Sequence, residues 1–113
     1  MDLVTEIYKL TRTFPQEEKF GLTSQLQRAA VSIPANIAEG HGRKATGAYL
    51  NHLSIANGSL MEVETFVQVA SRLGYLTSQQ EVNMLGRTDE IGKMLSGLQK
   101  SLNPRSSIPN PAS

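Results

Sequence analysis

The longest hydrophobic pattern lies in the middle of the chain, where apolar residues recur at alternating intervals of four and three. Its members are Tyr49, Leu53, Ala56, Leu60, Val63, Val67 and Ala70. This heptad spacing predicts a long helix with one continuous buried face. Ile55, Phe66 and Val69 widen that face, as expected for a helix that contacts two neighbours or a partner subunit. Gly58 weakens the helix, so we expect another backbone to approach closely there.

Two shorter patterns predict the first and last helices. The first pattern is formed by Leu3, Ile7, Leu10 and Phe14, and the proline that follows stops the helix. The last pattern is formed by Met84, Ile91, Leu95, Leu98 and Leu102, with Thr88 in the seam. Gly74 terminates the preceding helix, and Thr77 with Gln80 forms a capping box for the last one.

A fourth helix is predicted between them, with an apolar and a polar stripe. The apolar stripe consists of Leu22, Leu26, Ala30, Ile33 and Ile37. The polar stripe consists of Arg28, Ser32, Asn36 and Glu39. Pro34 lies inside the pattern and predicts a kink, because it lacks the backbone N–H of an interior helical residue. Gly40 and Gly42 can adopt positive φ, so we expect the helix to end at about Glu39.

The connectors between these segments are short. In PQEEKFG, residues 15–21, Phe20 is expected to be an apolar anchor, and Thr23 or Ser24 to cap the next helix. Thr46 is the expected cap of the long helix. Four amphipathic segments joined in this way predict an all-α, antiparallel, up-down-up-down four-helix bundle over residues 1–102. Residues 103–113, rich in proline and serine, are expected to form a flexible tail.

The run RAAVSIPANIAEGHGR, residues 28–43, resembles a known family, as do FPQEEKFGLTSQLQ before it and YLNHLSIANGSLMEVET after it. This is the four-helix-bundle family of bacterial 23S rRNA intervening-sequence proteins. The same family includes the accessory variability proteins of diversity-generating retroelements. The resemblance covers roughly residues 3–102. It implies a homopentamer around a central axis and, in the retroelement branch, a cofactor that brings RNA and a reverse transcriptase together.

Composition excludes several classes of protein. The chain has no cysteine, which rules out disulfides and thiolate metal sites and is compatible with a cytoplasmic location. No apolar run approaches the roughly 18 residues of a membrane span. Eleven Lys and Arg against ten Asp and Glu give a net charge of +1. This balance does not by itself predict nucleic-acid binding, so any basic surface must be local.

Catalytic chemistry finds no support in the motifs. Di-iron bundles need Glu-x-x-His pairs on facing helices, and the sequence contains none. There is no nucleophile elbow, and GHG is not followed by a Walker lysine–serine pair. We therefore expect a protein that is not an enzyme, with no metal and no cofactor.

Two groups of polar residues remain as candidate sites. The first group is expected to form a hydrogen-bonded network between helices or between subunits, with Arg28 or Arg43 compensating Glu39. It comprises Arg28, Ser32, Asn36, Glu39, Ser59 and Glu62. The alternative is that this stripe is a ligand or nucleic-acid surface.

The second group is a candidate nucleic-acid contact. It comprises Lys19, Arg28, His41, Arg43 and Lys44. A few phosphate contacts give little affinity, but fivefold repetition would supply on the order of ten or more cations. The alternative is a solvated loop. Tyr8, Tyr49 and Tyr75 all fit helix or turn packing, so binding should depend on shape and charge rather than on base sequence.

Two functional hypotheses follow. The first is a non-enzymatic, oligomeric scaffold or adaptor associated with RNA or DNA. The second is a protein-interaction module that binds a partner helix in its apolar grooves and never contacts nucleic acid.

Overall fold

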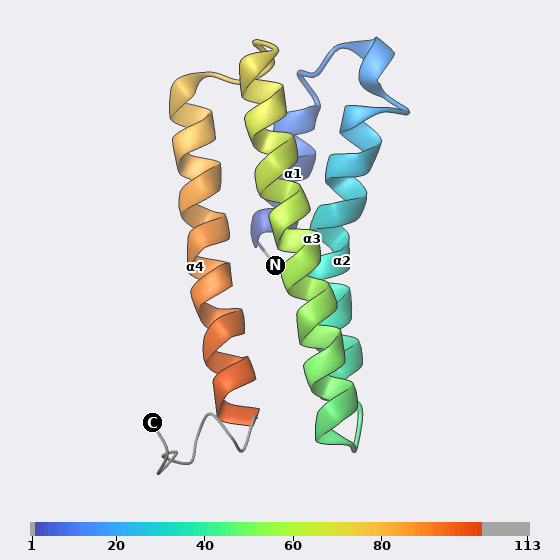
Figure 1. Cartoon of the computed structure of the whole chain (residues 1–113). Coiled ribbons are helices and arrows are strands. Elements are labelled where there is room, and N and C mark those ends of the chain that lie inside the picture. The colour runs from blue at the N-terminus through green and yellow to red at the C-terminus, as the bar shows by residue number, and fades with distance from the viewer. Residues whose placement is uncertain (1, 103–113) are drawn as a thin grey trace.

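The structure is a computed structural model that describes residues 2–102. In chain order its elements are α1 (Asp2–Thr11), the 3-10 turn η1 (Gln16–Glu18), α2 (Leu22–His41), α3 (Thr46–Arg72) and α4 (Ser78–Leu102). Consecutive helices run antiparallel, and α1 lies beside only one half of the longer helices (Figure 1). The predicted all-α bundle with its short first helix is confirmed. The half of the bundle away from α1 is built from α2, α3 and α4 (Figure 1).

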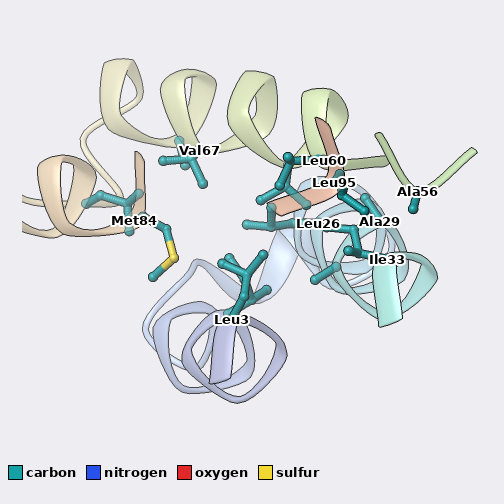
Figure 2. Packing of buried hydrophobic residues seen from close by; sticks show 14 of the residues in the cluster. Leu3, Leu26, Ala29, Ile33, Ala56, Leu60, Val67, Met84 and Leu95 are labelled. Carbon is teal, nitrogen blue, oxygen red and sulfur yellow. The ribbon is translucent and has the colours of Figure 1, made fainter. Parts of the chain in front are cut away.

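The hydrophobic seams predicted from the sequence form the core. On α3, all seam positions after Tyr49 are buried. Figure 2 shows side chains of all four α-helices meeting in one cluster, among them Leu3, Leu26, Leu60 and Met84. Burial of each such leucine contributes roughly 1.5–3 kcal/mol. The cluster therefore holds together helices whose own propensity is weakened by several glycines.

Two threonines are buried in this core because their hydroxyl groups find partners. The Thr11 hydroxyl donates to the carbonyl oxygen of Ile7 at 2.9 Å and accepts from Nε2 of Gln27 at 3.0 Å. This second bond joins α1 to α2. The Thr88 hydroxyl donates to the carbonyl oxygen of Leu85 at 3.0 Å. Threonine can thus occupy a seam position without leaving a buried polar group unpaired.

The turn between α3 and α4 follows the sequence prediction. Gly74 adopts a φ of +80°, and the N–H of Tyr75 donates to the carbonyl oxygen of Ala70 at 2.9 Å. The capping box is present: the N–H of Thr77 donates to Oε1 of Gln80 at 2.9 Å, and the Thr77 hydroxyl accepts from the N–H of Gln80 at 3.1 Å. Both predictions for this turn are confirmed.

The predicted caps of α2 and α3 are wrong. Thr23 and Ser24 lie inside α2, which begins one residue earlier, and the first backbone N–H of the helix donates to Oε1 of Glu18 at 3.4 Å. A carboxylate from the preceding turn thus takes the place of a hydroxyl cap. Thr46 is the first residue of α3, and the cap position is occupied by Ala45.

The end of α2 also differs from the prediction. The helix runs to His41 rather than to Glu39, and Gly40 is helical. Gly42 leaves the helix with a φ of −77°, which any residue can adopt. Within residues 2–102, Gly74 alone has positive φ. The glycines after α2 are therefore not needed for a left-handed turn.

A close approach of two helices does occur, but at a different glycine from the one predicted. A Cβ at Gly58 would meet no atom within 4 Å. A Cβ at Gly40 would lie 2.8 Å from Cβ of His52 and 3.0 Å from Cδ1 of Tyr49. Gly40 of α2 therefore lets the start of α3 pack against its backbone.

Two predictions are left open by the structure. The helical assignment of α2 runs through Pro34, and the kink there stays a prediction. The tail predicted for residues 103–113 lies outside the described residues.

Candidate functional site

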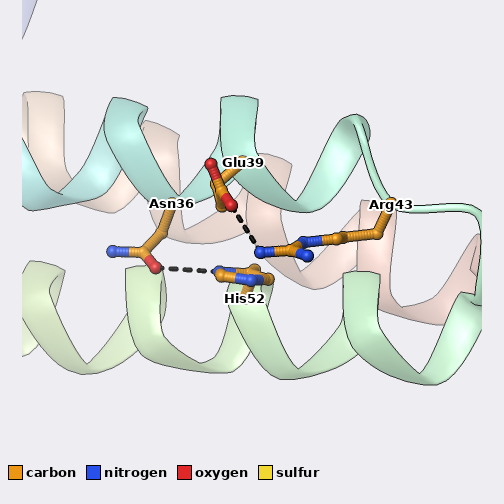
Figure 3. A network of polar contacts seen from close by, with 4 residues as sticks. All are labelled: Asn36, Glu39, Arg43 and His52. Carbon is orange, nitrogen blue, oxygen red and sulfur yellow. Dashed lines mark hydrogen bonds and ion pairs between the residues drawn. The ribbon is translucent and has the colours of Figure 1, made fainter.

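A polar seam joins α2 to α3 on one side of the core. Nδ2 of Asn36 donates to the carbonyl oxygen of Ser32 at 2.8 Å and to its hydroxyl at 3.0 Å. The Ser59 hydroxyl donates to the Ser32 hydroxyl at 2.8 Å. Oδ1 of Asn36 lies 3.1 Å from Nδ1 of His52 (Figure 3). The seam therefore brings together three residues of the predicted network, namely Ser32, Asn36 and Ser59.

The geometry of Asn36 fixes the proton on His52. A carbonyl oxygen only accepts, so the amide nitrogen of Asn36 must be the atom that faces Ser32. The amide oxygen then faces His52, and Nδ1 of the imidazole must be the donor. His52 was absent from the predicted network. It precedes Ser59 by seven residues, and this heptad interval could have placed both on the same face of α3.

Glu39 is compensated by Arg43, one turn along the chain. The two side chains form an ion pair in which each is about half exposed, at 56% and 50% (Figure 3). The alternative prediction, with Arg28 compensating Glu39, does not occur. Because the guanidinium already faces a carboxylate, Arg43 adds little net positive charge to the loop.

Arg28 and Glu62 lie on the outer side of the polar seam. Both line an open hollow between α2 and α3, together with Gln25, Ala29, Ser32 and Ser59. The structure shows no ion pair between Arg28 and Glu62 in the part of the chain that it describes. The hollow therefore carries one cation and one anion side by side, each open to a further partner.

The structure does not bring the predicted nucleic-acid contacts together. His41, Arg43 and Lys44 lie at one end of α2, whereas Lys19 lies before its other end (Figure 1). Twenty residues of helix separate these ends by about 30 Å. Within the loop itself, the imidazole of His41 packs edge-on against the ring of Tyr49 at 5.9 Å.

Phe20 is not an apolar anchor, because its side chain is 89% exposed. Nζ of Lys19 lies 5.6 Å from the centroid of its ring. The neighbouring Phe14 takes the buried position instead and packs against Tyr75, with ring centroids 5.5 Å apart. The sequence shows two phenylalanines near one turn, and only the packing decides which of them is exposed.

Residues 2–102 carry no recognisable metal site or membrane span. No group of three His, Asp or Glu side chains is placed to hold a metal ion. No helix in this range combines the length and the apolar character needed to cross a bilayer. The buried side-chain polar atoms in this part of the chain all have hydrogen-bond partners. The functional groups available to a partner are those on the surface.

Comparisons with known proteins agree with this architecture. A solved structure of a protein of unknown function from the S23 ribosomal protein family of Bacteroides thetaiotaomicron VPI-5482 superposes with a TM-score of 0.81. It shares 28% sequence identity, over 88% of this chain and 93% of that one. No curated protein matches the chain. The family model described as 23S rRNA-intervening sequence protein matches residues 1–97, and the chain therefore belongs to that family.

Proposed function

We propose that the protein is a non-enzymatic scaffold or adaptor that assembles with further copies of itself and associates with nucleic acid. The observation that carries the proposal is the outer α2–α3 face, which we define as Arg28, Ile55, Glu62 and Val69 around the hollow described above. Ile55 and Val69 are 44% and 40% exposed and lie seven residues to either side of Glu62. This heptad spacing places apolar, acidic and apolar side chains in one row on α3.

Such a face is suited to contact with a second copy of the chain. It offers apolar area together with one charge of each sign, so Arg28 of one copy can meet Glu62 of another. The resemblance noted in the sequence implies five copies around an axis. In a ring, each weak cationic surface is repeated, and the copies then act together on one polyanion.

Association with nucleic acid is inferred from exposed cations and from what the resemblance noted in the sequence implies for the retroelement branch. Three cations are exposed: Lys19 lies before α2, Arg28 within it and Lys44 after it. A single chain of net charge +1 would hold a phosphate backbone weakly. Repetition in an assembly would raise the affinity, and the contact would be made to the backbone rather than to base edges.

The proposal is tested by the solution mass, measured by light scattering with and without a mixed-sequence structured RNA at low and moderate salt. We expect an oligomer that takes up RNA at low salt and releases it as salt rises. Arg28→Glu and Glu62→Arg should each lower the mass, and combining them should restore it. Glu90→Arg, on the exposed face of α4, is the matched control. A monomer that ignores RNA would refute the proposal.

A second function is favoured by exposed apolar residues outside that face. Met61 on α3 and Val82 on α4 are 60% and 63% exposed, and Met94 on α4 is 45% exposed. These side chains would suit a protein-interaction module that binds a partner helix and no nucleic acid. Docking of this kind depends little on salt, in contrast to phosphate binding. Uptake of a protein partner that persists at high salt, without RNA uptake at low salt, would favour this function.

A further inference from the structure

The connector between α1 and α2 encloses a second hollow, at the end of the bundle opposite the His41–Lys44 loop. Its lining combines two cations with hydroxyl and amide groups. The residues are Thr11, Arg12, Phe14, Pro15, Gln16, Lys19 and Thr23. Arg12 and Lys19 are both exposed, and each can turn its charge toward a group held in the hollow. This arrangement fits a small anion with several acceptor oxygens.

Phe20 does not line this hollow, but it follows Lys19, which does, and its ring lies in solvent. At 89% exposure, the ring contributes little to the core and is accessible to a partner. Lys19 connects the two features, because it lines the hollow and its Nζ also lies 5.6 Å from the Phe20 ring centroid. A cation and an aromatic face are thus presented together, within the span of one nucleotide.

Among residues 2–102, the acidic residues of η1 form no ion pair with Arg12 or Lys19. Glu18 is held on the inner side, where Oε1 accepts from the N–H of Leu22 and Oε2 accepts from the hydroxyl of Tyr75 at 2.9 Å. Neither Glu17 nor Glu18 lines the hollow. This differs from the His41–Lys44 loop, where a carboxylate lies directly against the arginine.

We propose that this connector binds one nucleotide of a single-stranded nucleic acid, with the phosphate between Arg12 and Lys19 and the base stacked on Phe20. The inference rests on the proposed association with nucleic acid and names its point of contact. A base within a duplex is covered on both faces by its neighbours, so only an unpaired base can reach the ring. Every base has a π-face, so binding at this site tolerates any sequence.

The chain contains no tryptophan, so Phe20→Trp creates a single fluorescent reporter at the site. Titration with a mixed-sequence single-stranded oligonucleotide should quench this fluorescence, and salt should restore it. An equal length of duplex should quench it far less. Leu73→Trp is the matched control, since Leu73 is 53% exposed and does not line the hollow. Equal quenching of both reporters would overturn the proposal.

Affinity, measured by fluorescence anisotropy with the same oligonucleotide, separates stacking from apolar contact. Phe20→Ala should weaken binding about tenfold, and Phe20→Leu should be nearly as weak, because leucine keeps the apolar surface but lacks a stacking face. The double variant Arg12→Gln, Lys19→Gln should lower the slope of log affinity against log salt by about 1.4. Full affinity of Phe20→Leu would overturn the stacked-base assignment.

One comparison separates the failure of this inference from the failure of the proposed function. The double variant Arg43→Gln, Lys44→Gln tests the loop at the other end of α2. If the native chain binds the oligonucleotide, and the loop variant loses affinity while the Phe20 and Lys19 variants do not, the site is misplaced and nucleic-acid association stands. If the native chain takes up structured RNA but no single-stranded oligonucleotide at low salt, this inference alone is wrong; if it binds neither, both are wrong. Capture of a protein partner through Phe20 that persists at high salt would also overturn the nucleotide assignment.

Discussion

Both ends of α2 carry cations near carboxylates, but the structure describes an ion pair only at the His41 end. At the His41 end, Gly40 allows α3 to pack closely, and the arginine of the loop is paired with Glu39. At the η1 end, the carboxylate of Glu18 bonds to Tyr75, while Lys19 stays open to solvent beside Phe20. At the His41 end, the arginine is therefore paired with a carboxylate. At the η1 end, the lysine is available to a partner.

This difference shows that a count of cations does not identify a binding surface. Before folding, the run from His41 to Lys44 has the higher density of positive charge. In the folded chain, Glu39 offsets the charge of Arg43. In the connector between α1 and α2, by contrast, Arg12 and Lys19 line one hollow. A partner responds to the local field and shape, and these are properties of the fold.

The largest expected effect concerns packing at the His41 end of α2, around Gly40. Gly40→Ala should destabilise the protein by about 1–3 kcal/mol, because the new Cβ lies too close to Cβ of His52 and the helices must separate. Gly58→Ala should stabilise it by about 0.5–1 kcal/mol, since nothing lies near and alanine favours the helix. Chemical denaturation measures both. Equal effects of the two substitutions would show that the close approach does not exist.

A smaller effect is expected at the η1 end of α2, from the contact of Tyr75 with Glu18. Hydrogen bonding to this carboxylate raises the pKa of Tyr75 above its ordinary value of 10.0, with further contributions from burial and from the nearby negative charges. The contact therefore stabilises the fold fully below about pH 10, and its contribution is lost as pH rises through the raised pKa.

The test compares thermal unfolding of the native chain with that of Tyr75→Phe, which keeps the ring packed on Phe14. The variant should melt a few degrees lower at neutral pH, and the difference should shrink above pH 10. A constant difference across that range would contradict the assignment to the hydroxyl contact.

The smallest effect is expected from the ion pair between Glu39 and Arg43 at the His41 end of α2. Arg43→Gln should cost only about 0.3–0.5 kcal/mol, because Glu39 and Arg43 are exposed partners one helical turn apart. High salt should abolish even this difference. Lys93→Gln, which removes the exposed pair with Asp89, provides a control of the same spacing on α4. A cost of several kcal/mol would mean that the Arg43 contact contributes far more than an exposed pair.

Much of the fold could be predicted because its signals are local. The seam from Leu53 to Ala70 has one period over many residues, and the turn at Gly74 and Thr77 has a recognisable motif. The predicted caps of α2 and α3 were wrong because the first N–H groups of a helix can bond to a hydroxyl, to a carboxylate or to water. The choice depends on which neighbouring turn lies within reach.

The candidate site was predicted less well, for a related reason. Spacing placed Ser32 and Asn36 on one polar stripe, and both belong to the seam with α3. It did not indicate that His52 would complete that seam or that Phe20 would face solvent. It also left open whether Arg28 or Arg43 would pair with Glu39. Each of these outcomes depends on residues from more than one element or on the direction of a side chain.

The sequence by itself determined the number of helices, their order and the stripes that meet in the core, because hydrophobic period acts within each helix and short connectors force neighbours to be antiparallel. The tertiary structure alone decided where two backbones meet, at Gly40, and which end displays its charges. The physical reason is that packing distances and net local charge arise only when separate helices occupy a common space, where each side chain excludes or neutralises others.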